Sequence, residues 1–143
     1  MVLPLLVRRG LRVGYLKHAP AGFEIDQPGK DSYRIRRTGV LQTVLVGGRQ
    51  VALIDDAEAE PALEATIARY VRPDLDLLVV EGFKRSPLPK IEIARAALSH
   101  ELLCAGDADL IAVVSDFEPP AGIRHYALED ADGVAALIAA LIA

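Results

Sequence analysis

The amino-acid sequence predicts one α/β domain over residues 1–143, with a mainly parallel sheet in a three-layer arrangement. Apolar segments of strand length alternate with segments of helical spacing along most of the chain. Ala, Val, Leu and Ile dominate the apolar residues, while aromatic residues make up 5% and Trp is absent. Such a composition is typical of parallel strands buried beneath helices. Two predicted strands also run into charged residues, which is the usual layout of a ligand site on an open α/β sheet.

The first predicted elements are the end of a helix and a strand. Residues 1–9 have the pattern of a helix's last turns, because Gly10 can end the helix and Arg8 and Arg9 favour its negative end. The apolar residues 11–16 then predict a strand.

A short helix and a hairpin follow in the sequence. Asp31 near the start and Gly39 past the end bound a predicted helix over residues 31–38. Two apolar runs, residues 43–46 and 50–54, are separated by a Gly-Gly-Arg turn, which predicts a hairpin.

The rest of the chain predicts two more helices among further strands. Residues 57–70 have helical spacing, with Pro61 suited to the first turn. Asp130 is the expected cap of a final helix that runs to Leu141. The remaining strands are predicted at residues 75–80, 90–94, 110–114 and, at an edge of the sheet, 124–128.

Composition excludes several classes of protein. The 52% hydrophobic and 25% charged content is that of a globular chain, and the net charge of −4 argues against a general nucleic-acid binder. Cys104 is the only cysteine, which excludes an internal disulfide and fits a reducing compartment. The longest apolar run, residues 134–143, is half the roughly 20 residues that a membrane span needs. We therefore expect a cytoplasmic protein that contacts neither membrane nor nucleic acid.

A charged loop over residues 17–33 is the most informative part of the chain. It holds lysines, a histidine, acids, prolines and glycines directly after an apolar strand, and such a loop suggests a site. Glu81 follows the apolar residues 75–80 in the same way. A carboxylate there can hold Mg²⁺, which prefers oxygen ligands, or can simply pair with Lys17 or Lys84.

Lysines and a glycine complete the candidates that the pattern itself provides. Lys17, Lys30 and Lys84 lie near predicted strand ends or in the charged loop, where each could neutralise a phosphate or remain a solvated surface charge. Gly82 would let the backbone approach phosphates closely, or would serve only to form a turn.

Four segments of the chain match one known family in order and over nearly the whole length. They are Leu16-Lys17-His18, Asp26-Gln27-Pro28-Gly29-Lys30-Asp31-Ser32-Tyr33, Val80-Glu81-Gly82-Phe83-Lys84 and Ala112-Val113-Val114-Ser115-Asp116. The chain thereby resembles the MobB family of molybdopterin-guanine dinucleotide biosynthesis adaptor proteins. This resemblance implies a P-loop NTPase-like fold that binds GTP and Mg²⁺, forms a homodimer and has at most weak GTPase activity.

The resemblance also implies partners and residue roles. The expected partners are the guanylyltransferase that attaches GMP to molybdopterin, molybdopterin itself and the molybdenum-insertion enzyme. The implied nucleotide-binding residues are Lys17, Asp26, Lys30, Gly82, Lys84 and Asp116, with Glu81 as the metal ligand and no catalytic residue. Asp26 would lie near the magnesium and phosphate end. Asp116 would accept the ring N–H and the amine of guanine, although it could instead only begin a turn.

Other charged or reactive residues have simpler interpretations. Asp31 is expected to cap the following helix, and a lone His18 is a poor metal site and more suited to a structural role. Arg34, Arg36 and Arg37 could grip an anion or an acidic partner surface, or form a solvated basic face. Cys104 lies in an apolar, helix-like patch and is expected to pack there.

The sequence departs from the family at its start. The string G-x-x-x-x-G-K-[ST], which cradles phosphates, does not occur, because Gly29-Lys30 is followed by Asp31. From this departure we expect that the family's first strand and phosphate loop are missing from the chain. Either the start codon was assigned too late, or the protein is a natural variant without the loop. A sheet without that strand would be unstable alone, or would close the gap by rearranging or pairing.

Two other functions remain open at this point. The chain could be a non-nucleotide interaction module of the same pathway, or a small metabolic kinase, since Glu-Gly after a strand also occurs in such kinases. The absent phosphate loop argues against the kinase.

Overall fold

The computed structural model describes residues 1–142, which form two compact units. The first unit comprises Met1–His18 and the chain from Val71 onward, and the second is Ala19–Tyr70. The prediction of one domain over the whole chain stays a prediction. Among the described residues, no helix is long and apolar enough to span a membrane.

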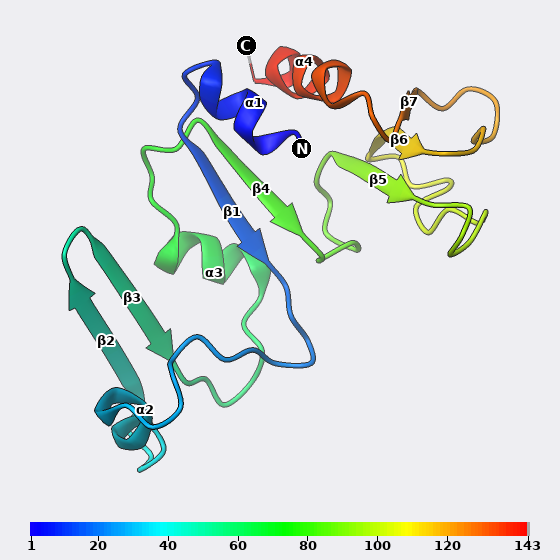
Figure 1. Ribbon diagram of the computed structural model, residues 1–143. Helices are drawn as coiled ribbons and strands as arrows, with labels where there is room; N and C mark the ends of the chain where they lie inside the picture. Colours follow the sequence, from blue (N-terminus) through cyan, green and yellow to red (C-terminus); the bar gives the residue numbers. More distant parts are fainter. Residues whose placement is uncertain (143) are drawn as a thin grey trace. The chain divides into compact units, whose positions relative to one another are not determined.

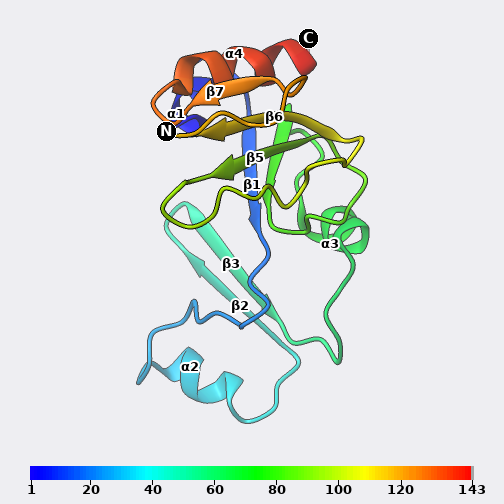
Figure 2. The ribbon, with the colours of Figure 1, turned by 90° about the vertical axis from the view of Figure 1, so that its right-hand side faces the viewer.

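The strand pairs of the first unit are all parallel among its described residues (Figure 1). Its elements are α1 (Leu3–Arg8), β1 (Val13–Lys17), β4 (Leu77–Glu81), β5 (Lys90–Ala94), β6 (Leu110–Ser115), β7 (His125–Ala127) and α4 (Ala131–Leu141). Strands β1 and β4 pair in parallel, with Lys17 opposite Glu81 at their carboxyl ends. Strands β5, β6 and β7 form a second parallel sheet in that order, with β7 at an edge as predicted (Figure 2).

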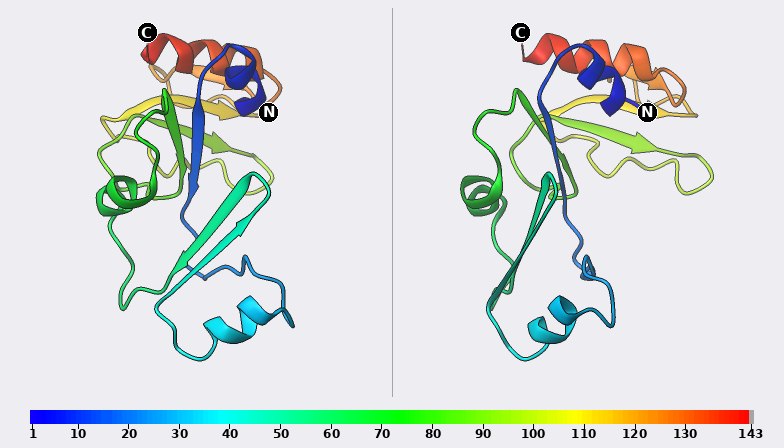
Figure 3. Two further views of the ribbon diagram at one scale, coloured as in Figure 1. Left: turned by 90° about the vertical axis from the view of Figure 1, so that its left-hand side faces the viewer. Right: turned by 60° about the vertical axis from the view of Figure 1, so that its left-hand side comes forward.

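The core of the first unit lies between helices and the second sheet. Figure 3 shows α1 and α4 side by side, and Leu6 of α1 is completely buried. Val134, Ala135 and Leu137 are the buried residues of α4. Asp130 caps α4 as predicted, because its side chain accepts a hydrogen bond of 2.9 Å from the Gly133 N–H.

The second unit contains the charged loop and an antiparallel hairpin. Its elements are α2 (Asp31–Arg36), β2 (Gln42–Gly47), β3 (Gln50–Asp55) and α3 (Leu63–Tyr70). The hairpin confirms the prediction from the Gly-Gly-Arg turn. Asp55 at the end of β3 accepts a hydrogen bond from the Tyr70 hydroxyl and pairs with Arg69 at 2.8 Å, which ties α3 to the hairpin.

Two sequence predictions are wrong in detail. Residues 57–62 are not helical, and α3 begins only at Leu63. Pro61 restricts the residue before it to extended backbone, so it precedes the helix instead of occupying its first turn. The segment around Cys104 is not helical either but consists of turns, because Gly106 has φ +94° and the Glu92 carboxylate takes the Leu103 and Cys104 N–H groups.

An exposed ion pair fixes the start of β1 against β4, and its effect depends on pH. Arg12 donates to Asp76 from its backbone N–H at 2.7 Å and from two guanidinium nitrogens at 3.1 and 2.6 Å. These hydrogen bonds lower the pKa of Asp76 from 3.8 to about 2. A carboxyl group whose pKa is lower in the folded state stabilises the protein fully above its unfolded pKa, and that contribution is lost as the pH falls through the folded pKa.

We therefore expect Asp76→Asn to lower the free energy of unfolding at neutral pH, with a difference from wild type that shrinks between about pH 4 and pH 2. Urea unfolding of both proteins across this range measures the difference. Glu58→Gln, which removes an exposed acid elsewhere, is the matched control and should show no such narrowing. If the difference in unfolding free energy between Asp76→Asn and the wild type stayed constant down to about pH 2, the stabilising role of the charged Asp76 would be contradicted.

Candidate functional site

The carboxyl ends of β1 and β4 bring together a lysine, a tyrosine and a carboxylate. The Lys17 Nζ lies 2.7 Å from Glu81 Oε1, and the Tyr15 hydroxyl donates to Glu81 Oε2. Tyr15 and Lys17 reach the same carboxylate because residues two apart on a strand share a face. The sequence prediction did not include Tyr15, because the predicted strand ended at residue 16 and the contact of Tyr15 with Glu81 depends on the register of β1 and β4.

These contacts keep Glu81 charged. Hydrogen bonds from Lys17 and then from Tyr15 lower the pKa of the Glu81 carboxyl, and the same contact raises the pKa of Lys17. The Glu81 side chain is 54% exposed, so a cation in solution can reach it. The ion pair that the sequence allowed for Glu81 is therefore present, with Lys17 as the partner.

A strained turn follows Glu81 and is held by His18. The His18 N–H donates to the Glu81 carbonyl oxygen at 2.8 Å, and the His18 ring stacks on Phe83 with centroids 4.3 Å apart. Gly82 has φ +91°, and a Cβ there would lie 2.7 Å from His18 Cβ. Phe83 also has a positive φ, of 47°, which is costly for an aromatic residue. Gly82 is thus required both by its backbone angle and by close packing.

The remaining candidates of the first unit lie in different surroundings. Lys84 lines a pocket with Arg85, and it makes no ion pair among the described residues. Asp116 accepts the Ala96 N–H at 2.7 Å through Oδ1, so one of its two oxygens holds the loop after β5. Within residues 1–142, no three His, Cys, Asp or Glu side chains form a cluster able to hold a metal ion. A magnesium ion at Glu81 would therefore need water or phosphate oxygens as further ligands.

In the second unit, Asp26 is a buried carboxylate that is only half satisfied. Its side chain is 9% exposed, and Oδ1 accepts the Gln27 N–H at 2.8 Å and the Ser32 hydroxyl at 3.1 Å. Oδ2 is also buried but has no hydrogen-bond partner in the described part of the chain. Because native proteins rarely leave a buried polar atom unpaired, this oxygen suggests a ligand.

The start of α2 corrects one prediction. Lys30, not Asp31, occupies the N-cap position, and no side chain caps the helix. Asp31 accepts only the neighbouring Ser32 N–H, at 2.9 Å, because it is already the first helical residue. Its charge there still favours the positive end of the helix. The Lys30 side chain is exposed and has no ion pair among the described residues.

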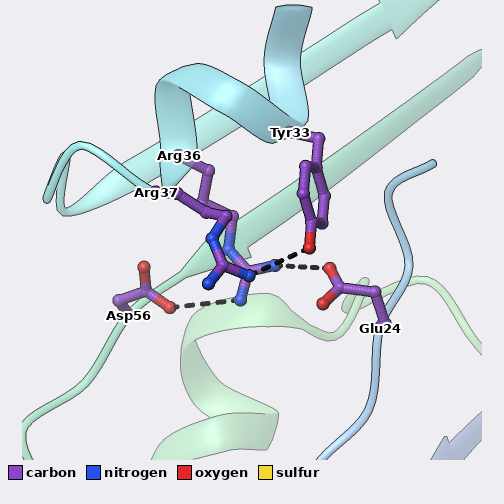
Figure 4. Close-up of a pocket in the computed structure, with 5 residues that line it drawn as sticks. All are labelled: Glu24, Tyr33, Arg36, Arg37 and Asp56. Atoms are coloured by element: carbon purple, nitrogen blue, oxygen red, sulfur yellow. Dashed lines mark hydrogen bonds and ion pairs between the residues drawn. The ribbon is translucent and has the colours of Figure 1, made fainter. Parts of the chain in front are cut away.

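Arg36 of α2 and Arg37 directly after the helix are engaged within the second unit (Figure 4). Arg36 pairs with Glu24 at 2.9 Å and with Asp56 at 3.6 Å. Arg37 donates to the Tyr33 hydroxyl at 2.9 Å and lies over the Tyr33 ring. The five residues line an open hollow of about 210 Å³, below the roughly 300 Å³ of ordinary ligand pockets. Arg36 is thus an internal tie between loop, helix and hairpin.

Comparisons with known proteins agree with this architecture. A family model described as "Molybdopterin guanine dinucleotide synthesis protein B" (MobB) matches residues 1–116. The "Molybdopterin-guanine dinucleotide biosynthesis adapter protein" of Escherichia coli (strain K12) is 34% identical over 139 residues, covering 94% of this chain and 78% of that protein. The protein of the same name from Haemophilus influenzae is 32% identical over 101 residues, covering 71% of this chain and 57% of that protein.

A solved structure gives the same result for the fold. The crystal structure of "molybdopterin-guanine biosynthesis protein B (mobB)" superimposes with a TM-score of 0.71 at 25% identity, covering 99% of this chain and 86% of that chain. The predicted α/β fold class is confirmed by this likeness and by the parallel sheets. The family model covers most of the chain, and the chain therefore belongs to the MobB family.

Proposed function

We propose that this protein is an adapter of molybdopterin-guanine dinucleotide biosynthesis that binds GTP with Mg²⁺ and assists the guanylyltransferase in the cytoplasm. The relatives from Escherichia coli and Haemophilus influenzae carry the adapter name, which supports the pathway. The observation that carries the nucleotide part is the Lys17–Glu81 pair, which lies at the carboxyl ends of two parallel strands. Ligands of open α/β sheets bind at that edge.

The chemistry of the site fits a magnesium nucleotide. Glu81 is charged and accessible, so its carboxylate would hold Mg²⁺, and Lys17 would then be released to a phosphate oxygen. Bound Mg²⁺ would offset the negative charge of the phosphates. In the first unit, Lys84 would add positive charge. In the second unit, taken by itself, the free Oδ2 of Asp26 is an oxygen suited to a cation or its water, and Lys30 is an exposed cation in the same loop. Gly82 would contribute through the turn that it allows beside His18, and the second oxygen of Asp116 would accept hydrogen bonds from guanine.

The hairpin supports the further proposal of a homodimer. The register places Val44 opposite Leu53 and Val46 opposite Val51 on one face, and these four side chains are 43–78% exposed. The outer edges of β2 and β3 have no strand partner among the described residues. An apolar face beside free strand edges suits pairing with a second copy of the chain. Sedimentation that finds only monomer would contradict this arrangement.

Isothermal titration of GTP with Mg²⁺ into the purified chain tests the nucleotide proposal. We expect binding by the wild type and about tenfold weaker binding by Glu81→Gln, because a charged oxygen ligand is lost. Glu58→Gln is the control and should bind as the wild type does. If the wild type does not bind GTP, the nucleotide proposal fails, and the non-nucleotide interaction module becomes the better explanation. Co-purification with the guanylyltransferase then tests that alternative.

A further inference from the structure

The first unit contains a pocket that is larger than the hollow at Arg36 in the second unit and is lined by other charged residues. It has a volume of about 460 Å³ and is lined by Lys84, Arg85, Leu103, Cys104 and Asp107. That volume lies within the roughly 300–1,000 Å³ of ordinary small-molecule pockets, unlike the hollow at Arg36. None of the family-derived roles involves Arg85, Leu103, Cys104 or Asp107. The pocket therefore requires its own explanation.

Strand β5 fixes one wall of this pocket. Lys90 and Glu92 lie two residues apart on β5, so both side chains leave the same face of the strand. Lys90 pairs with Asp107 at 3.0 Å and with Asp109 at 3.6 Å. The Glu92 carboxylate accepts the N–H groups of Leu103 at 2.7 Å and Cys104 at 2.9 Å. Two backbone N–H groups of a segment without helix or strand are thus anchored to β5 at the pocket.

Lys84 and Arg85 carry the positive charge of the pocket lining, and they follow a constrained turn. Lys84 and Arg85 directly follow Gly82 and Phe83, whose positive φ angles are maintained by the packing of His18. Both cations are exposed, and neither has an ion pair within the described residues. Backbone strain that surrounding contacts maintain is often found where a side chain must be aimed at a ligand.

The charges in the pocket favour an anion. Asp107 is the one acid among the described lining residues, and Lys90 pairs with both Asp107 and Asp109. The Glu92 carboxylate behind Leu103 and Cys104 is bound by their N–H groups. Lys84 and Arg85 therefore outnumber the acid that lines the pocket, on a chain whose overall net charge is −4. Lys and Arg together suit phosphate, which accepts several charge-assisted hydrogen bonds. The exposed Leu103 side chain and the volume leave room for an organic group attached to that phosphate.

We propose that the pocket formed by Lys84, Arg85, Leu103 and Cys104 binds the phosphate end of a small phosphate ester. This pocket rests on the proposed function only through Lys84, which also belongs to the proposed nucleotide site. Its other lining residues have no part in that site. The phosphate belongs either to the nucleotide or to a phosphomonoester that is not a nucleotide. Both sources present the same group to Lys84 and Arg85, and the experiment separates them.

Cys104 is a built-in reporter because it lines the pocket and is the only cysteine of the chain. We expect phenyl phosphate to slow alkylation of Cys104 more than sodium chloride of equal ionic strength does. Lys84→Gln or Arg85→Gln should each weaken this protection about two- to fivefold, and the double variant about tenfold. Arg8→Gln with Arg9→Gln, which removes two exposed cations at the end of α1, is the control for net charge.

The outcomes are distinct. If GTP also protects Cys104 from alkylation, and the protection depends on Lys84 and Arg85 in the same way, the phosphate belongs to the nucleotide. If phenyl phosphate protects Cys104 and GTP does not, the phosphate belongs to another phosphomonoester. In the second case the pocket stands even if the GTP titration fails. Titration calorimetry of phenyl phosphate into the same variants gives a readout independent of the thiol. Equal effects of phenyl phosphate and sodium chloride, or binding unchanged in the double variant, would overturn the proposal.

Discussion

Replacing Gly82 by alanine is expected to lower the free energy of unfolding by about 2–4 kcal/mol, the largest single effect that the structure predicts. Two causes combine at this position. A non-glycine residue at φ +91° is strained by about 1–2 kcal/mol, and the new Cβ would lie 2.7 Å from His18 Cβ. The His18 ring would have to move away from Phe83, so the direction of Lys84 would change as well. Urea unfolding measures the loss of stability.

Gly122 provides a matched control for this prediction. Its φ is +92°, nearly that of Gly82, but nothing lies within 4 Å of where its Cβ would stand. Gly122→Ala should therefore show the backbone strain alone, about 1–2 kcal/mol. In a His18→Gly background the steric part should vanish, and Gly82→Ala should then cost about as much as Gly122→Ala. Equal costs in the wild-type background would show that His18 does not confine Gly82.

Much of the fold follows from local signals that the tertiary structure does not override. The hairpin was predictable because the Gly-Gly-Arg turn and the apolar runs beside it both favour it. Asp130 was predictable as a cap because its side chain serves its own helix. The turns around Cys104 were not predictable, because they depend on Glu92. This residue lies on a strand that is separate in the sequence and binds the N–H groups of the turns. An apolar pattern over a short segment cannot reveal such a contact.

Part of the candidate site was also predictable from the sequence. The pairing of Lys17 with Glu81 follows once two strands are placed in parallel, since both residues lie at the carboxyl ends. Tyr15 and the stack of His18 on Phe83 depend on the exact register and on a strained turn, which residue types alone do not indicate. Asp31 was expected as the cap, but the helix starts at Asp31 itself, and such boundaries commonly shift by one residue.

Asp26→Asn should change stability and ligand binding in opposite directions. Asparagine keeps the oxygen that accepts from Gln27 and Ser32 and replaces the unpartnered Oδ2 by a neutral amide. A buried unpaired charge costs more than a buried unpaired amide, so the free chain should become more stable, by about 1–2 kcal/mol. Binding of GTP with Mg²⁺ should weaken about tenfold or more, because the free oxygen suited to the cation is lost. Urea unfolding and isothermal titration on the same preparations measure both effects.

The opposite signs are what distinguish a ligand-binding role from a structural one. Groups arranged for a ligand are often unfavourable until the ligand is present, so removing them stabilises the free protein. A purely structural Asp26 would instead lose stability on substitution and leave GTP binding unchanged. Asp31→Asn is the matched control, since this exposed acid of the same motif accepts only a local N–H and has no buried oxygen to release. It should change neither quantity by more than a small amount, whereas a loss of stability in Asp26→Asn with normal GTP affinity would remove Asp26 from the proposed site.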